Sequence, residues 1–267
     1  MSKISVTSFV TVAMIGFLVS GPAGAWVIDF DDGVGGEFAA NTIFGNGDGT
    51  SFQRYTAGIP ASAASVAISA DNNRSSGPDL AVGFDSTNGS SRDNDLEELF
   101  DPIGGSASSG YGNILIIQSG ENDFTSSCAT TPGSGGVCDG NRADDEAQGG
   151  TLTFSFDQSV RLFGLDIFDT EEGGGQVTFL DEDGIDIVGT PLTAPNVGDN
   201  GVGFMDFGSE GIIAKTLIVE FRGSGALDNI RGDTVSQVTE PATLGLFGAS
   251  LIALGLYRRR QRSERRL

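Results

Sequence analysis

Short apolar runs separated by turns rich in Gly, Asp, Asn and Ser fill the chain between its two ends, and this pattern constrains the fold more than any other feature. Residues 151–156 (Thr-Leu-Thr-Phe-Ser-Phe) alternate strictly between polar and apolar side chains, which is the period of a strand with one buried face. No long stretch in this part has the apolar spacing of a helix. The sequence therefore predicts an all-β domain and disfavours a parallel α/β fold, which would need crossover helices.

The predicted strands belong to one domain, residues 26–238, and favour an antiparallel β-sandwich of the jelly-roll type. Phenylalanine dominates the aromatic residues, with 18 Phe against 3 Tyr and 1 Trp, and it recurs at inward positions. A Phe-rich core is expected rather than an aromatic sugar-binding face. Two polar stretches, 86–102 and 119–150, are expected to be large loops. The predicted strands are 27–30, 66–69, 80–84, 113–118, 151–156, 162–168, 177–181, 185–188, 202–207, 217–221 and 227–230.

The N-terminal 25 residues have the composition of a secretory signal helix. Lys3 supplies a positive charge, residues 6–19 form a short apolar run, and Ala23 and Ala25 are the small residues of a cleavage site. A membrane anchor is the weaker alternative, because the run is short for a span and a Gly-Pro break follows it. Cleavage by signal peptidase would leave Trp26 as the first residue.

The C-terminal segment, residues 239–267, has the order Glu240-Pro241, an uncharged stretch at 242–257, and a cluster of arginines that begins at Arg258, Arg259 and Arg260. This order predicts a short single transmembrane helix whose basic end stays in the cytoplasm.

The same segment resembles the PEP-CTERM sorting signal of Gram-negative bacteria, although Thr239 stands where that signal usually has its first proline. The resemblance implies an exosortase as partner, which cuts near Glu240-Pro241. It also implies a precursor tethered transiently to the inner membrane, and then a location at the cell surface or in the extracellular matrix. An ordinary single-span anchor is the alternative.

The charge of the middle of the chain excludes several classes of function. Of 36 acidic and 15 basic residues, 34 acidic but only 8 basic ones lie between Trp26 and Val238, a formal charge of −26. Such a surface repels nucleic acid and anionic lipid and attracts cations. The chain has no histidine, so Ser-His-Asp relays and His-ligated zinc sites are absent.

The two cysteines, Cys128 and Cys138, lie in the second polar stretch. In an exported chain the simplest interpretation is one disulfide that closes this loop. A redox-active pair is disfavoured because the Cys-x-x-Cys spacing is missing.

Two acidic clusters at opposite ends of the domain suggest a metal site. Asp29 and Asp31 follow the first predicted strand, and Asp228 and Asn229 lie in the last. Terminal strands of a sandwich are often neighbours, strand alternation would place Asp29 and Asp31 on one face, and Ca²⁺ prefers carboxylate and carbonyl oxygens. The arrangement is similar to jelly-roll carbohydrate-binding modules, in which a structural Ca²⁺ joins terminal strands. Solvated surface acids are the alternative.

A further acidic run, residues 181–186, contains Asp183-Gly184 between two apolar segments, which predicts a hairpin turn. Segments 80–85, 93–96 and 224–230 also resemble exported PEP-CTERM proteins, a resemblance that brings no activity with it.

These features favour a non-enzymatic exported protein of the cell surface or matrix, stabilised by Ca²⁺ and associated with acidic exopolysaccharide. The alternatives are a Ca²⁺-dependent carbohydrate-binding module and a glycoside hydrolase or lyase that uses two carboxylates.

Overall fold

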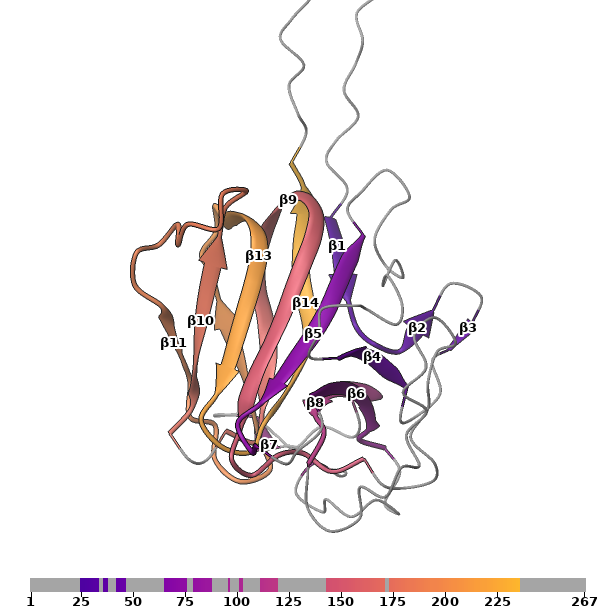
Figure 1. Cartoon of the computed structure of the whole chain (residues 1–267). Helices are drawn as coiled ribbons and strands as arrows, with labels where there is room; N and C mark the ends of the chain where they lie inside the picture. Colours follow the sequence, from indigo (N-terminus) through magenta and orange to yellow (C-terminus); the bar gives the residue numbers. More distant parts are fainter. Residues whose placement is uncertain are drawn as a thin grey trace, which may run out of the picture. The chain divides into compact units, whose positions relative to one another are not determined.

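The computed structural model describes residues 25–33, 36–37, 42–46, 65–75, 79–87, 96, 101–102, 111–119, 143–170 and 173–235. They belong to one compact unit, Gly24–Val235. These residues form strands and turns only, which confirms the all-β prediction (Figure 1). Within the same ranges there is no helix of the length and apolar character that a membrane span requires. The predicted signal helix, C-terminal helix and Cys128–Cys138 disulfide lie outside the described residues.

Fourteen strands are present in the described part of the chain. They are β1 (Ala25–Ile28), β2 (Asp32–Gly33), β3 (Gly36–Glu37), β4 (Ile43–Asn46), β5 (Val66–Asn72), β6 (Leu80–Asp85), β7 (Asp101–Pro102), β8 (Asn113–Ile117), β9 (Gly150–Phe168), β10 (Gly175–Leu180), β11 (Leu192–Ala194), β12 (Gly201–Asp206), β13 (Ile212–Phe221) and β14 (Ala226–Thr234).

Strand β9, 19 residues long, organises the domain. Its first half lies between β5 and β13, and its second half lies between β14 on one side and β12 and the start of β13 on the other. At the bend between the halves, residues 156–159 of β9 lie opposite a single residue of β13, Lys215. Lys215 Nζ donates to the Asp157 carbonyl oxygen at 2.6 Å. The sequence predicted two separate strands here, 151–156 and 162–168, because polar residues at the bend interrupt the apolar pattern.

The remaining strands extend the sheet from β9 in two directions. Strands β13, β10 and β11 lead to one edge, whereas β5, β4, β6, β8 and β14 form a path that returns to β9. Most pairs are antiparallel, as predicted, and the parallel pairs among the described strands are β4–β5 and β7–β12. Figure 1 shows β5, β9 and β13 in front of β14.

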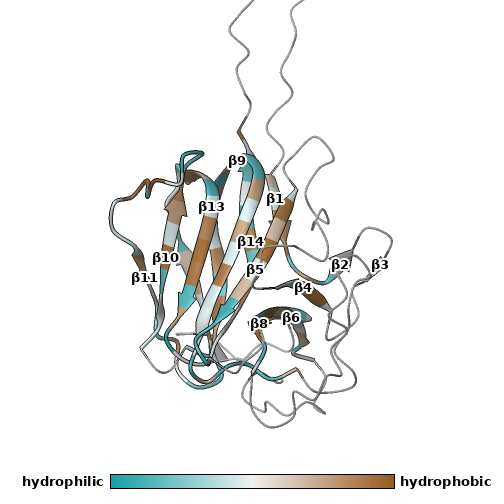
Figure 2. Ribbon diagram, viewed as in Figure 1, coloured by the Kyte–Doolittle hydropathy of each residue, from teal (hydrophilic) through white to brown (hydrophobic). Residues whose placement is uncertain are grey.

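Phenylalanine fills the core, as the sequence predicted. Apolar and polar residues alternate along β5, β9 and β13 in Figure 2, as one-sided burial requires. Eight of the ten largest fully buried side chains are Phe30, Phe44, Phe84, Phe154, Phe156, Phe168, Phe179 and Phe221.

The predicted strand 185–188 is wrong. Ile185 is 61 % exposed, and these residues form the loop that leads from β10 to β11. The preceding turn is present as predicted: the Asp181 N–H donates to the Ile185 carbonyl oxygen at 3.0 Å, and Gly184 has a φ of 76°. A short run of apolar residues after a turn predicts a strand, but here the run contacts β10 through a single bridge, Leu180–Asp186, and one hydrogen bond, from the Ile187 N–H to the Phe179 carbonyl oxygen at 2.9 Å. The next strand along that edge of β10 is β11, which pairs with Gly175–Val177.

Candidate functional site

The first and last strands of the domain lie side by side, as the sequence predicted. Strand β1 pairs antiparallel with β14, with Ala25 opposite Asp233 and Ile28 opposite Ile230. The pairing brings the chain that follows β1 to the middle of β14, where Asp228 and Asn229 lie. It also places Ala25, the last residue of the predicted signal peptide, beside the C-terminal end of β14.

The chain after β1 leaves the sheet at once. Phe30 has a φ of 44°, its ring is buried, and the Asp31 N–H donates to the Asp29 carbonyl oxygen across the turn. Strand alternation therefore does not set the directions of Asp29 and Asp31, contrary to the expectation. Asp31 instead points to the start of β8, where its Oδ1 accepts the Asn113 N–H at 2.6 Å.

Asp228 is the most deeply buried acid of this region, with 1 % of its surface exposed. It lies beside a bulge of β14, where Asn229 has a φ of 50°. Its Oδ2 accepts the Asn229 Nδ2 at 2.9 Å, whereas its Oδ1 has no hydrogen-bond partner. A buried carboxylate oxygen without a partner is costly, so this atom requires an explanation.

Asp166 was not among the predicted ligands. It lies in β9, where it faces Asp228 in the pairing register. Arg231 binds it with two nitrogens, Nη1 to Oδ1 at 3.0 Å and Nη2 to Oδ2 at 3.1 Å. The Asn229 Nδ2 lies 3.0 Å from Asp166 Oδ2 and so bridges the two carboxylates. The arrangement depends on a bulge that places two residues of β14 on one face. Strand alternation could not predict this bulge.

These residues, Asp29, Asp31, Asp166, Asp228, Asn229 and Arg231, are called the seam cluster below. Burial raises the pKa of Asp228 to about 9. The Asn229 backbone N–H opposes this shift, and the charges of Asp31, Asp166 and Asp29 add to it. Of the four residues predicted as metal ligands, Asp228 and Asn229 are in contact, whereas Asp29 and Asp31 act on Asp228 through their charges. No three acidic side chains of the described residues converge closely enough to hold an ion by themselves.

An exposed aromatic ring lies beside the seam cluster. Phe204 of β12 faces Asp166 in register and is 51 % exposed, and the Arg231 Cζ lies 4.5 Å from the ring centroid. The ring reaches across Gly164, where a Cβ atom would lie 2.4 Å from Phe204 Cζ. The sequence predicted a Phe-rich core and did not single out Phe204 as an exposed ring. The alternation of Phe204 and Asp206 with buried Met205 and Phe207 was the signal that this prediction missed.

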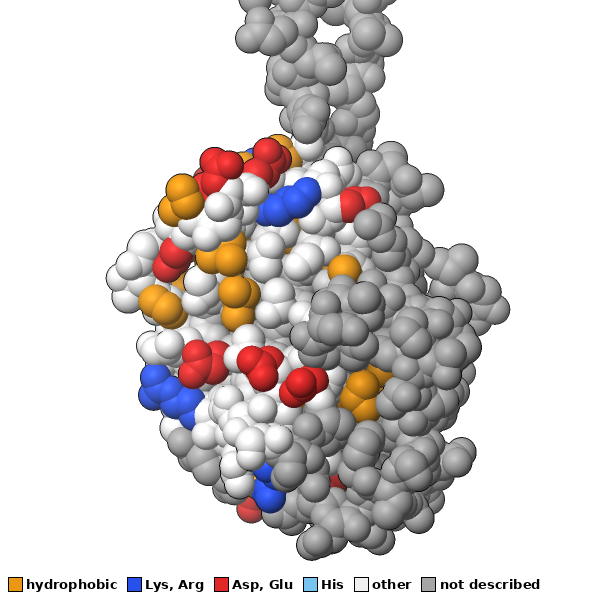
Figure 3. Space-filling view, in the orientation of Figure 1, with side chains coloured by type: hydrophobic (Ala, Val, Ile, Leu, Met, Phe, Trp, Pro, Cys, Tyr) orange, Lys and Arg blue, Asp and Glu red, His pale blue; other side chains and the backbone are white. Residues whose placement is uncertain are grey.

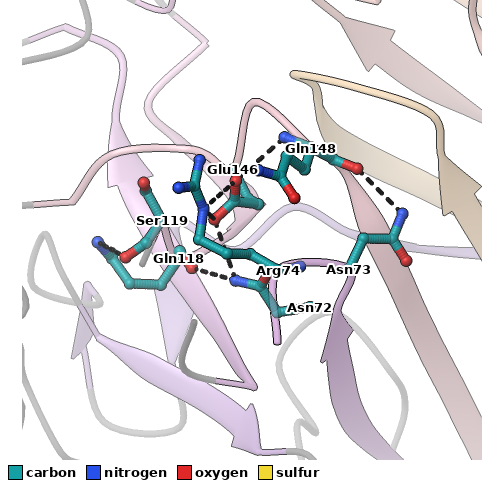
Figure 4. A network of polar contacts seen from close by, with 7 residues as sticks. All are labelled: Asn72, Asn73, Arg74, Gln118, Ser119, Glu146 and Gln148. Atoms are coloured by element: carbon teal, nitrogen blue, oxygen red, sulfur yellow. Dashed lines mark hydrogen bonds and ion pairs between the residues drawn. The ribbon is translucent and has the colours of Figure 1, made fainter. Parts of the chain in front are cut away.

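Two buried polar networks lie at another end of the sheet. In the first, the Glu146 side chain is fully buried and accepts from Arg74 Nε at 3.0 and 3.1 Å and from the Gln148 N–H at 3.0 Å (Figure 4). In the second, Ser224 Oγ lies 2.5 Å from Asp145 Oδ2 and 2.6 Å from Asp169 Oδ2. These contacts join strands and the segment before β9, and they serve the fold.

The face in Figure 3 carries scattered acidic side chains with few basic ones and some exposed apolar residues. On this face the acidic side chains of the described residues are not gathered into one patch. Cys128, Cys138, Glu240, Pro241, Arg258, Arg259, Arg260 and Ala23 lie outside the described residues.

Comparison with known families identifies the C-terminal segment. Residues 237–261 match the model of the PEP-CTERM protein-sorting motif. The match begins shortly after β14 ends at Thr234. The C-terminal segment is thus a sorting signal of the exosortase type, as the resemblance implied.

The β domain has partial structural likenesses. A fucose binding module of Streptococcus pneumoniae is 12 % identical and has a TM-score of 0.24, with 34 % of this chain and 69 % of that chain covered. Discoidin II of Dictyostelium discoideum is 9 % identical and has a TM-score of 0.27, with 39 % and 48 % covered. No curated protein matches the sequence significantly. The assignment of the chain therefore depends on the sorting motif alone.

Proposed function

We propose that this chain is an exported, non-catalytic protein with a jelly-roll-like β domain, which an exosortase sorts to the cell surface or extracellular matrix. The observation that carries the proposal is the sorting motif at residues 237–261, which follows directly on a compact all-β unit. Signal peptidase would act at the other end, at Ala25, which lies opposite Asp233 in the β1–β14 pair. In the sequence, the sorting motif begins shortly after β14 ends at Thr234.

The charge of the domain supports a place in a polysaccharide matrix. A formal charge of −26 keeps the domain soluble and repels polyanions in the absence of counterions. Divalent cations would bridge such a surface to an acidic exopolysaccharide. This association would depend on cations and would weaken when they are chelated.

The sorting part of the proposal is tested in a Gram-negative host with an exosortase and in the same host without it. We expect the full chain to lose residues up to Ala25 and its arginine-rich tail in the first host, and to stay in the inner membrane with the tail in the second. Intact-mass analysis of each fraction measures both ends. Pro241→Ala should block release, whereas Thr239→Pro, which restores the usual proline, should be processed like the wild type.

Recovery of the chain from the cytosol with Met1 and Leu267 both attached would contradict the proposal. The matrix part is measured separately, as co-sedimentation of the exported protein with extracted exopolysaccharide. We expect binding in millimolar Ca²⁺ and its loss in chelator, and equal binding in both conditions would contradict the bridging role.

A carbohydrate-binding module is the second candidate, and the exposed Phe204 favours it. An aromatic ring beside Arg231 and Asp166 offers an apolar face together with hydrogen-bonding groups, which is the composition of a sugar-binding surface. On a glycan array, Phe204→Ala should abolish binding, and Ile213→Ala, which removes another exposed apolar side chain, should not. A wild-type protein that binds no glycan would remove this candidate.

A glycoside hydrolase gains no support from the seam cluster. Such an enzyme needs two carboxyl groups that a substrate reaches. Asp228 is 1 % exposed, and Asp166 is occupied by Arg231 and Asn229.

A further inference from the structure

We propose that cleavage after Ala25 creates an ammonium group on Trp26 that pairs with Asp233 of β14 and so fixes the new N-terminus of the domain on its last strand. The inference rests on the proposed function for the position of the cleavage. Hydrolysis breaks the bond between the Ala25 carbonyl carbon and the Trp26 nitrogen. The oxygen of the water molecule goes to the Ala25 carboxylate, which leaves with the leader, and its two hydrogens end on the Trp26 nitrogen.

The register of the strands places the cleaved bond beside Asp233. Ala25 lies opposite Asp233, and Trp26 lies opposite Gly232. Residues that face one another in an antiparallel pair have their Cα atoms about 4.5–5.5 Å apart and their side chains on the same face. Ala25 is exposed and Trp26 is buried, so Asp233 lies on the outer face with Ala25. Because the Trp26 nitrogen follows Ala25 directly, an ammonium group there is within reach of the Asp233 carboxylate.

The Asp233 carboxylate has an oxygen that such a group can bind. Its Oδ1 is buried and has no hydrogen-bond partner among the described residues. Its Oδ2 lies 3.5 Å from Arg161 Nη1, which is a long contact for an ion pair. A buried carboxylate oxygen without a donor is costly and uncommon. An ammonium group carries three hydrogens and would supply the missing donor, while Arg161 stays at the other oxygen.

The side chain of Trp26 holds the new N-terminus in position. Trp26 is 3 % exposed, its ring contacts the backbone at Gly232, and its centroid lies 6.0 Å from that of Phe156. Surface ion pairs usually contribute little, in part because two long side chains lose their freedom when they meet. Here the cation lies on a backbone atom next to a buried ring, and its partner is a short side chain. We therefore expect this pair to contribute more than an ordinary surface pair.

The ion pair would offset a loss that cleavage itself causes. Strand β1 has four residues, Ala25–Ile28, and cleavage removes the first of them together with its place opposite Asp233. Trp26 then lies at the end of a three-residue strand. Processing would exchange one residue of strand pairing for one ion pair, and the processed domain would keep its first strand in place.

The experiment compares two forms of one chain in mild detergent. A fusion partner replaces residues 1–25, and a protease that cuts directly before Trp26 releases the chain 26–267 from it. The uncut fusion is the second form, in which the Trp26 nitrogen is part of a peptide bond. Export plays no part in this preparation, so a failure of the ion pair is distinguishable from a failure of the sorting proposal. Intact mass of the exported chain gives the natural cut, and a first residue other than Trp26 would overturn the inference.

Asp233→Asn is made in both forms, and Tm is measured by circular dichroism. In the uncut form this substitution affects the contact with Arg161, whereas in the cut form it also removes the partner of the ammonium group. We expect it to lower Tm by about 2–4 °C more in the cut form than in the uncut form. Asp183→Asn removes an equal charge from an exposed turn and should change Tm equally in both forms. An equal effect of Asp233→Asn in the two forms overturns the proposal.

The reactivity of the amine is the second measurement. The cut form has two kinds of amine, the α-amine of Trp26 and Lys215 Nζ, because the other lysine of the chain is Lys3. The Asp233 carboxylate should raise the pKa of the α-amine above its ordinary value of about 8, which lowers the share of the reactive neutral form. We expect acetylation of the α-amine at pH 7, followed by mass spectrometry, to be about two- to tenfold slower in the wild type than in Asp233→Asn. Lys215 is the internal reference, and equal rates for the α-amine in the two proteins overturn the proposal.

Discussion

The indole of Trp26 lies against Gly232, the residue that faces it across the β1–β14 pair. A Cβ atom on Gly232 would lie 2.4 Å from the Trp26 ring and 2.8 Å from the Arg161 carbonyl oxygen. Gly232→Ala should therefore push the ring out of its place and destabilise the domain by about 1–3 kcal/mol. Urea unfolding followed by circular dichroism, which does not depend on Trp26, measures the loss.

The control for this prediction is a double-mutant cycle. Trp26→Phe removes the part of the ring that meets the new methyl group, so Gly232→Ala should cost less in the Trp26→Phe background than in the wild type. Equal costs in the two backgrounds would show that the ring is not what the methyl group displaces.

The Arg74–Glu146 pair should contribute more to stability than the more exposed ion pair between Arg161 and Asp233. The Glu146 side chain is 0 % exposed and that of Arg74 is 22 % exposed (Figure 4). Arg74→Met leaves a buried carboxylate without its cation, which costs about 3–5 kcal/mol. Arg161→Met is the matched control, because its contact with Asp233 is longer, at 3.5 Å, and more exposed, so it should cost at most about 1 kcal/mol. Similar losses in chemical denaturation for the two variants would contradict this ranking.

Local pattern predicted most of the strands because apolar alternation and turn residues act over a few neighbours. Val66–Asn72 and Leu80–Asp85 begin where the sequence placed them. The local pattern failed where pairing with strands that are distant in the sequence decides whether a segment is a strand. The bend of β9 continues as strand because β13 pairs with β9 both before and after it. Ile185 and Val188 stay in a loop because their segment meets β10 at one bridge, Leu180–Asp186, while β11 pairs with the other part of that edge.

The candidate site shows the same division. The pairing of the first and last strands, beside which Asp29, Asp31, Asp228 and Asn229 lie, was predictable because the terminal strands of a sandwich often meet. The role of these residues as metal ligands stays a prediction. Asp166 was not predictable, because its place opposite Asp228 depends on the register of β9 with β14 and on a bulge. The exposure of Phe204 was not predictable from its residue type, since most strand phenylalanines here are buried.

Ser224 should be necessary for the buried contact between Asp145 and Asp169, which are 8 % and 0 % exposed. Its hydroxyl lies within 2.6 Å of an oxygen of each carboxyl group. Ser224→Ala leaves these oxygens with fewer partners and should cost about 1–3 kcal/mol of stability. Ser155→Ala, at an exposed position of β9, should change stability by about 0.5 kcal/mol or less.

A hydroxyl has one hydrogen and cannot donate to both carboxylates at once. In Asp169→Asn the side-chain amide nitrogen can donate to Ser224 Oγ, where the carboxylate is only a second acceptor. Asparagine also tolerates the φ of 50° at this position. This variant should therefore be nearly as stable as the wild type in thermal melts. A loss as large as that of Ser224→Ala would contradict the sharing of one hydrogen.

Asp228 should make the metal-free domain less stable as the pH rises. Its pKa is about 9 in the folded chain, against an ordinary value of 3.8. Between these values the folded state keeps a proton that the unfolded state releases, so the free energy of unfolding falls with pH, by at most about 1.4 kcal/mol per pH unit. Its contribution is fully present below about pH 4 and is lost as the pH passes 9. Asp228→Asn cannot titrate and should lack this slope, so the difference between the two proteins in EGTA, from urea unfolding at pH 5 to 9, isolates it. A difference that stays constant over this range would show that Asp228 is ionised in the folded domain.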